Sequence, residues 1–404
     1  MHAKFCHLSS VLVHPSTVSM SDRLYFDWNA TAPLREEARA AVLSALDVLG
    51  NPSSVHAEGR AARRLIERAR EEVAALVAAE PRNVVFTSGG TEANALALTP
   101  VPQGTRPARL LISAIEHASV LAGGRFVASQ IEKLPVQPTG LVDLDALERR
   151  LAANTESTLV SIMLANNETG AVQPISEIAA LVHHAGATLH VDAVQGPGRI
   201  ACNINELGAD LLSISGHKIG GPTGTGALIR RDARTPFPNP LIRGGGQERG
   251  LRAGTENVAG IAGFGAAAAA LAKDRLSKAE NLLRLRQRLE SGLKDHSAET
   301  VIFGDGVARL PNTTLFAIPG VKAETAVIAL DLEGVAVSSG AACSSGKVQA
   351  SHVLAAMGVP GLLARGAIRV SLGSTTSESD VDRFISAWIK VSDTLLKVSK
   401  AAAA

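Results

Sequence analysis

The sequence predicts an α/β protein whose mainly parallel sheet is covered by helices on both faces. The first observation is a series of short apolar segments typical of buried strands, at 84–87, 110–113, 159–164, 188–192, 210–215 and 227–230. The second is that amphipathic helical patterns lie between most of them, at 60–77, 91–98, 144–152 and 175–185. The third is composition: 46% of the 404 residues are hydrophobic and 19% are charged, which excludes intrinsic disorder.

After these strands, residues 260–294 show the pattern of one long helix, which is Ala-rich at first and then charged on one face. We interpret it as the connector to a smaller α+β domain, with strands at 313–318, 335–338 and 367–371 and helices at 323–332, 351–357 and 377–399. The predicted division is therefore a tail at 1–20, a large domain at 30–262, and a small domain at 263–404 that also includes 21–29.

The charge balance argues against two classes of partner. Lysine and arginine total 40, aspartate and glutamate total 38, and aromatic residues make up only 3%. A main partner that is nucleic acid or an anionic membrane usually requires a basic excess, which is absent here. The longest apolar run, 260–272, falls short of the ~20 residues that cross a bilayer. We expect a soluble protein.

Three cysteines, Cys6, Cys202 and Cys343, are too few for a disulfide framework in a chain of this length. A reducing compartment follows, and we predict a cytoplasmic protein. The first twenty residues lack the features of a secretory signal. They contain no acidic residue, so an organelle transit peptide stays open; we favour a dispensable tail that precedes Met20.

Two motifs end predicted strands, and ligands of such sheets bind beyond the carboxyl ends of the strands. In FTSGGTEANALAL, Gly89 and Gly90 allow a tight turn before a helix that starts near Thr91, which forms an anion site suited to phosphate. In LHVDAVQ, Asp192 closes a buried strand, where a carboxylate could pair with a cation. The alternatives are an ordinary capped turn and an N-cap aspartate.

Two further motifs carry nucleophiles. In SISGHKIGG, Lys218 follows a strand, where desolvation would lower the pKa of its amine and suit it to a Schiff base. A lone lysine is more often a solvated surface charge. Cys343 lies in a stretch of Ser, Gly and Ala without an aliphatic packing pattern, whereas Cys202 is typical of a core thiol. Together, the acid, the amine, the anion site and the cysteine suit a phosphate-bearing aldehyde, pyridoxal 5'-phosphate.

These motifs carry a resemblance that extends from about residue 24 to 382. The segments NPSSVHAEGR, FTSGGTEANALAL, IEHASV, NNETGAVQPI, HVDAVQ, SISGHKIGGPTGTGAL, GGGQERGLRAGTENV, SSGAACSSG and IRVSLG occur in the order found in cysteine desulfurases. The sequence thus resembles this group of the class V aminotransferase family, pyridoxal phosphate enzymes of fold type I. The resemblance implies a seven-stranded sheet in the large domain, a homodimer, and conversion of L-cysteine to L-alanine with a persulfide on Cys343. The sulfur would pass to an acceptor such as an iron–sulfur scaffold, or serve another thio-cofactor.

The resemblance also implies roles for single residues. Lys218 would hold the cofactor covalently and move the substrate's α-proton. Asp192 would pair with the pyridine nitrogen, and His117 would stack on the ring and assist proton transfer. Binding roles are implied for the other residues: Gln195 and Asn167 at the ring oxygen, Asn167 and Arg369 at the substrate carboxylate, Gly90, Thr91, Ser215 and His217 at the phosphate, and Thr255 at the phosphate of the neighbouring subunit.

Alternatives remain at this stage. A selenocysteine lyase, a β-eliminating enzyme or a transaminase would keep Lys218 and Asp192 but would not need Cys343. A non-catalytic protein of the same fold would have no reason to keep all of these residues, and a dehydrogenase would need a strand–GxGxxG–helix unit that is absent. No metal is predicted, because no acid or cysteine completes a ligand set with His183, His184 and His190. Gly90 departs from the family, where alanine is frequent, as does Trp28.

Overall fold

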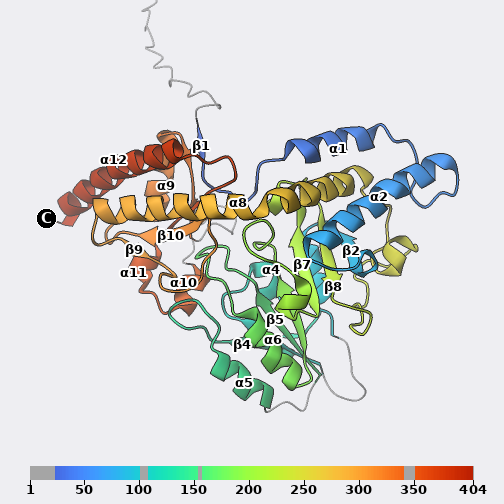
Figure 1. Cartoon of the computed structure of the whole chain (residues 1–404). Coiled ribbons are helices and arrows are strands. Elements are labelled where there is room, and N and C mark those ends of the chain that lie inside the picture. The colour runs from blue at the N-terminus through green and yellow to red at the C-terminus, as the bar shows by residue number, and fades with distance from the viewer. Residues whose placement is uncertain (1–22, 101–107, 153–156, 341–350, 404) are drawn as a thin grey trace, which may run out of the picture.

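The computed structural model describes residues 23–100, 108–152, 157–340 and 351–403. Its largest sheet has seven strands among these residues, in the order β2-β8-β7-β6-β5-β3-β4 (Figure 1). The five strands from β7 to β4 are parallel, and β8 runs antiparallel between β7 and β2. The bounds are β2 (Val84–Thr87), β3 (Ala108–Ser113), β4 (Ile131–Leu134), β5 (Ser157–Met163), β6 (Thr188–Asp192), β7 (Leu211–Ser215) and β8 (Gly226–Arg230).

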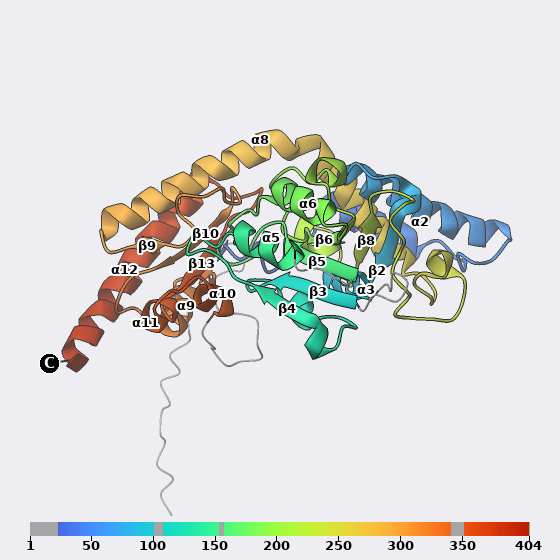
Figure 2. The same ribbon diagram turned by 90° about the horizontal axis from the view of Figure 1, so that it is seen from below.

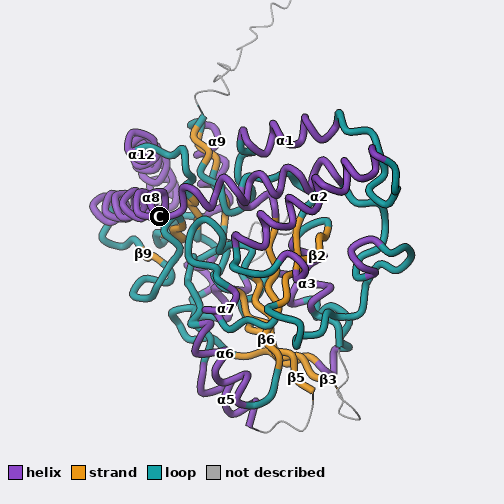
Figure 3. Tube along the Cα trace, turned by 45° about the vertical axis from the view of Figure 1, so that its right-hand side comes forward, coloured by secondary structure: helices purple, strands orange, loops and turns teal. Residues whose placement is uncertain are grey.

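Helices cover both faces of this sheet, as predicted (Figure 3). One face carries the main apolar core, to which the strands contribute with α2 (Ala57–Leu76), α5 (Leu144–Ala152), α6 (Ile175–His184), α7 (Ile204–Leu207) and the first half of α8 (Val258–His296). The other face packs against α3 (Gly90–Ala97) and the short α4 (Ala118–Leu121). The helix α1 (Glu36–Leu46) packs on α8.

The remaining strands form two small sheets. A four-stranded antiparallel sheet has the order β12-β13-β10-β9, and β1 pairs in parallel with β11. The strands are β1 (Leu24–Tyr25), β9 (Val301–Ile302), β10 (Thr313–Ala317), β11 (Val335–Ala336), β12 (Ser338–Ser339) and β13 (Ile368–Ser371). The helices here are α9 (Ala323–Leu332), α10 (His352–Ala356), α11 (Gly361–Ala364) and α12 (Glu378–Ala403).

The helix α8 joins the two sheets. Its first half contributes Ile261, Phe264 and Leu271 to the core of the seven-stranded sheet. Its second half contributes Leu285 and Leu289 to a separate core that contains α12 and β13. Figures 1 and 2 show α8 extending from beside α12 to beside α1 and α2. The connector is thus present, while the predicted domain boundary at 262/263 stays a prediction. None of the described helices combines the length and the apolar character that crossing a membrane requires.

The short elements β1, β9, α4, α7 and α11 were not predicted, and three longer or paired elements also differ from the sequence analysis. The edge strand β4 was not predicted, because Glu132 and Lys133 interrupt the apolar pattern. The helix α1 was not predicted either, since only two of its eleven residues, Ala38 and Ala45, are buried. The single strand expected at 335–338 is divided into β11 and β12, which pair with different partners.

Candidate active site

One cavity of about 280 Å³ brings together ten of the twelve predicted site residues. It lies at the edge of the large sheet where β2, β6 and β7 end. Gly226 at the start of β8 is the register partner of both Thr87 and Ser215, so the ends of β2 and β7 are held beside one another. The ten residues that line the cavity are Gly90, Thr91, His117, Asn167, Asp192, Gln195, Ser215, His217, Lys218 and Arg369.

The turn between β2 and α3 supplies an anion site. Gly89 has a φ of 153°, which only glycine adopts readily, and α3 begins at Gly90. The first amides of an α-helix have no partner within the helix, and the first two residues of α3, Gly90 and Thr91, line the cavity. A Cβ atom on Gly90 would lie 2.8 Å from Cγ2 of Val194. The side chain of Val194 therefore fills the space that the methyl group of an alanine at position 90 would need, which accounts for glycine at this position.

Asp192 ends β6 and is buried. Its Oδ1 accepts a hydrogen bond from the amide of Val194 at 3.0 Å, and its Oδ2 accepts one from Nδ2 of Asn94 at 2.7 Å. Burial raises the pKa of Asp192, although these two bonds and the charges of His117 and Lys218 act in the opposite direction. A cation bound beside this carboxylate would favour its charged form.

His117 caps α4 through its ring. Nδ1 accepts a hydrogen bond from the amide of Ser119 at 3.2 Å and lies 2.8 Å from the hydroxyl of Ser119. Because a backbone amide can only donate, the neutral ring carries its proton on Nε2. Burial lowers the pKa of His117, which the Asp192 carboxylate opposes. Burial thus favours the neutral imidazole of His117, whereas the Asp192 carboxylate favours its protonated form.

Lys218 lies in the 3-10 turn Gly216–Ile219 that follows β7. Its Nζ donates to the carbonyl oxygens of Asn29 at 2.5 Å and Ala30 at 2.8 Å. The adjacent His217 bonds Thr31, and burial together with the charge of Lys218 lowers the pKa of His217 to about 4. The amine is therefore held beside the N-terminal segment, next to a neutral imidazole.

Arg369 reaches the cavity from the middle of β13. Its Nη1 donates to the carbonyl of Asn167 at 3.0 Å, and its Nη2 donates to Oδ1 of Asp27 at 2.7 Å. Arg369 is only 6% exposed, so its ion pair with Asp27 is not an ordinary surface pair. Its Nε is buried and has no acceptor among the described residues. An orphaned donor in a cavity wall is available to a ligand.

Sequence reasoning missed several partners of these residues. Asn94 lies on α3 one turn after Gly90, so its position in the motif could have indicated that it faces the same cavity. Asp27 and Asn29 come from the N-terminal segment, which no local pattern connects to Arg369 or Lys218. Glu116 is fully buried beside His117 and receives a hydrogen bond from Ser113.

The two remaining predicted residues are Thr255 and Cys343. Thr255 is exposed and lines a separate cavity of about 250 Å³ with Thr87 and Arg252. Cys343 lies outside the described residues, as do Cys6 and the predicted tail. Cys202 is buried, as expected of a core thiol.

Within the described ranges no group of three or more His, Cys, Asp or Glu side chains is placed to hold a metal ion. His190 is buried between the hydroxyls of Ser161 and Ser213, each 2.8 Å from a ring nitrogen. His183 contacts Asp210 instead. These histidines are accounted for by structural hydrogen bonds.

Comparison with known proteins shows which family this chain belongs to. The family model described as Aminotransferase class-V matches residues 24–384. The chain is 41% identical to the cysteine desulfurase IscS of Dictyoglomus turgidum, over 94% of this chain and 97% of that relative. It is 42% identical to a cysteine desulfurase of Cereibacter sphaeroides, over 94% and 98%. A solved structure of a NifS-like protein from Rickettsia africae superposes with a TM-score of 0.84 at 40% identity, covering 92% of this chain and 99% of that one.

Proposed function

We infer that this chain, which belongs to the class V aminotransferase family, is a cysteine desulfurase that depends on pyridoxal 5'-phosphate. It converts L-cysteine to L-alanine and supplies sulfur for iron–sulfur cluster or other thio-cofactor assembly. Its fold is that of the fold type I enzymes. The roles of single residues that follow are part of the proposal.

The observation that carries these roles is the convergence of an amine, a carboxylate and a helix start on one cavity. Lys218 follows β7, Asp192 ends the adjacent parallel strand β6, and α3 begins at Gly90. These groups fit the aldehyde, the pyridine nitrogen and the phosphate of pyridoxal phosphate, respectively. The orphaned Nε of Arg369, in the same wall, fits the carboxylate of an amino acid.

When bound, pyridoxal phosphate supplies an electron sink for the α-carbon of the amino acid. Asp192 would keep the pyridine nitrogen protonated, and Gln195 and Asn167 would bind near the ring oxygen. Thr91, Ser215 and the neutral His217 would bind the phosphate. Nζ of Lys218 would take the α-proton from the substrate, and His117 would assist the proton transfers beside the ring.

The sulfur transfer itself needs a thiolate, for which we propose Cys343. An ordinary thiol has a pKa of about 8.5, so forming the thiolate at pH 7 costs roughly 2 kcal/mol. The Cys343 sulfur would attack the substrate sulfur, forming an S–S bond as the substrate's carbon–sulfur bond breaks with its electron pair going to carbon. Protonation of that carbon completes L-alanine and leaves a persulfide on Cys343.

Three finer features belong to the same proposal. Thr255 points to a homodimer, because it is predicted to serve a neighbouring subunit and does not line the cavity of its own chain. The acceptor would be a scaffold protein for iron–sulfur clusters, either general or dedicated to nitrogenase. The cysteine content favours the cytoplasm as the location.

Mass spectrometry after incubation of the holoenzyme with L-cysteine tests the reaction and the nucleophile together. We expect a one-sulfur adduct on Cys343, with alanine in solution. Cys343→Ser should abolish both, whereas Cys202→Ser, at a buried thiol, should retain both. Turnover that persists in Cys343→Ser would instead favour a selenocysteine lyase, a β-eliminating enzyme or a transaminase.

A further inference from the structure

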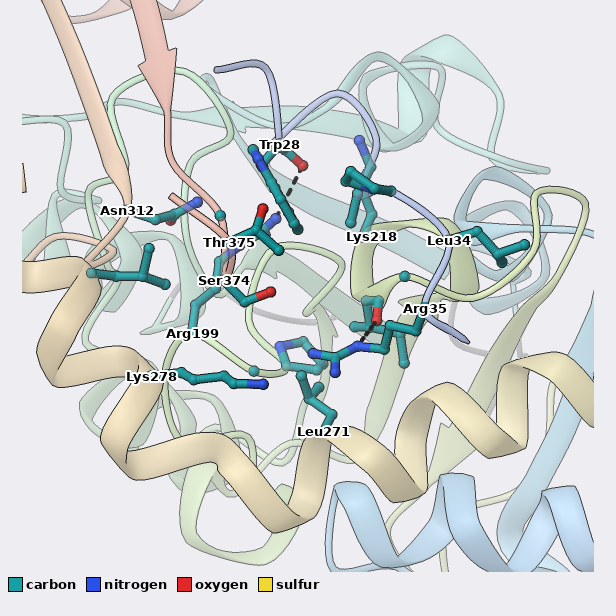
Figure 4. Close-up of a pocket in the computed structure, with 18 of the residues that line it drawn as sticks. Trp28, Leu34, Arg35, Arg199, Lys218, Leu271, Lys278, Asn312, Ser374 and Thr375 are labelled. Atoms are coloured by element: carbon teal, nitrogen blue, oxygen red, sulfur yellow. Dashed lines mark hydrogen bonds between the residues drawn. The ribbon is translucent and has the colours of Figure 1, made fainter. Parts of the chain in front are cut away.

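A second cavity, of about 440 Å³, lies beside the candidate active site (Figure 4). Lys218 lines both cavities, and the other residues that line the second cavity are different. Its walls come from the segment between β1 and α1, the turn after β6, the middle of α8 and the residues that follow β13. We call it the Arg199 cavity and define it by Trp28, Arg35, Arg199, Leu271, Ser374 and Thr375.

Arg199 is a buried cation whose hydrogen bonds all go to neutral acceptors. It is 8% exposed. Its Nη1 donates to the backbone oxygen of Gln195 at 3.0 Å and to the side-chain oxygen of the same residue, and its Nη2 donates to the carbonyl of Trp28 at 3.4 Å. Among the described residues no carboxylate bonds it. Burial lowers the pKa of Arg199 to about 10, so the guanidinium is still charged at neutral pH. Buried arginines are ordinarily paired with an anion.

One edge of this guanidinium is available. Within the described part of the chain, Nε of Arg199 has no hydrogen-bond acceptor, and Nη2 uses only one of its two protons, on Trp28. Nε and Nη2 lie on the same side of the planar group, where they form the edge that binds a carboxylate through two parallel hydrogen bonds. Arg199 lines the cavity, so a ligand there is within reach of this edge.

The other lining groups narrow the class of ligand. Apolar side chains, including Trp28, Leu271 and Leu372, form much of the wall and favour a hydrocarbon portion. The charged lining residues are Arg35, Arg199, Lys218 and Lys278 against Glu36 and Glu37, so the cations outnumber the carboxylates and the lining favours an anionic group. We propose that the Arg199 cavity is a second ligand site, which binds a small organic monocarboxylate through Arg199.

The chain carries a reporter for this site. Only two tryptophans are present, Trp28 and Trp388. Trp388 is fully buried against Phe316, away from the cavity, so Trp388→Phe leaves Trp28 as the sole tryptophan emitter. The Trp388→Phe holoenzyme is titrated with butyrate, with butyramide as the uncharged analogue of equal size, and with inorganic phosphate.

We expect a saturable change in Trp28 emission with butyrate, and at least about tenfold weaker binding of butyramide and phosphate. In the same background Arg199→Met should weaken butyrate binding by at least about tenfold, and Arg199→Lys should weaken it less. Arg234→Met, at an exposed arginine, should leave it unchanged. Equal responses to butyrate and butyramide, no saturable response at all, or tighter binding of phosphate would each overturn the proposal. The comparison of the three probes needs no Arg199 variant, so it stays decisive if Arg199→Met fails to fold.

Discussion

The Asp192 carboxylate depends on its neighbours for its charge. It is buried in the cavity wall, and burial alone favours the neutral acid. The amide of Val194 and the side chain of Asn94 donate to its two oxygens and stabilise the charged form. The second atom of the Asn94 amide, Oδ1, has no partner among the described residues. Asn94 is therefore held in place mainly by its donor bonds to Asp192 and Ser119.

Replacing Asn94 by alanine should make Asp192 harder to ionise. A hydrogen bond to a charged group contributes about 1.5–3 kcal/mol, so its loss should raise the pKa of Asp192 by roughly one to two units. We expect the acid limb of the turnover–pH profile to move upward by a similar amount, so that activity is lost first on the acid side of the profile. Asn205→Ala, at an exposed asparagine that bonds a carbonyl, is the control. An acid limb that does not move in Asn94→Ala would contradict this role.

Glu116 should make the stability of the protein depend on pH. It is fully buried, its Oε1 accepts from Ser113 and from the amide of Met163, and burial raises its pKa to about 8. Between the ordinary carboxyl pKa and this value, the folded state binds a proton that the unfolded state has released. The contribution of Glu116 to stability is therefore complete at low pH and is lost as pH rises toward 8.

Glu116→Gln removes this titration, and the amide resembles the protonated acid. Between about pH 6 and pH 8 we expect the free energy of unfolding of the wild type to fall, relative to the variant, by roughly 2 kcal/mol. Urea unfolding at both pH values measures the difference. If the gap between the two proteins is the same at both, Glu116 does not titrate in this range.

At the scale of elements, the sequence predicted the buried strands and missed the exposed elements. Strands β5, β6 and β7 are buried almost throughout, and their continuous apolar runs were sufficient to predict them. The edge strand β4 and the exposed helix α1 lack such runs, because solvent tolerates charge there. The division of 335–338 into β11 and β12 depends on pairing with β1 and β13, which lie far away in the sequence.

The helix α10 is the first described element after the segment that carries Cys343. Ser351 caps this helix by accepting from the amide of Leu354, and its hydroxyl donates to Glu168 at 2.5 Å. His352 contacts the carbonyl of Glu116 at 3.0 Å. These contacts attach α10 to the two loops that also carry Asn167 and His117.

Ser351→Ala should loosen that attachment. Loss of an N-cap destabilises a protein by about 0.5–2 kcal/mol, and Glu168, whose pKa burial already raises to about 7, would lose its donor. We expect a lower melting temperature and faster amide exchange in α10, whereas Ser386→Ala, at an exposed serine in α12, should change neither. Unchanged exchange at the start of α10 would show that the cap is dispensable.

At the scale of the whole molecule, the site is assembled from both sheets. Arg369 belongs to β13 of the small sheet, yet it bonds Asn167 and Asp27, and Asn29 bonds both Asn167 and Thr313. The motifs identified which side chains line the cavity, because each motif ends a strand. They did not reveal these contacts between distant segments, which depend on how the two sheets are placed. Thr255 lies outside the cavity of its own chain, which fits its predicted place at the neighbouring subunit.

Thr255 therefore provides a test of the dimer. If it contacts the phosphate bound by the neighbouring subunit, Thr255→Ala should weaken retention of pyridoxal phosphate by about tenfold, the loss of a hydrogen bond to a charged group. The wild type should also have about twice the 41.8 kDa mass of one chain in light scattering. Both results are required, since a monomer could not use a threonine in this way.

A mixed dimer separates the two subunits' contributions. When a Thr255→Ala subunit is paired with a Lys218→Ala subunit, only the first can bind the cofactor covalently, and the threonine beside that cofactor would come from the second. Cofactor retention is followed by the visible absorption of the covalent complex. For each subunit that keeps Lys218, retention in the mixed dimer should therefore equal that of the wild type. Retention as weak as in the Thr255→Ala homodimer would place Thr255 at the phosphate of its own chain, and the site would then be complete within one subunit.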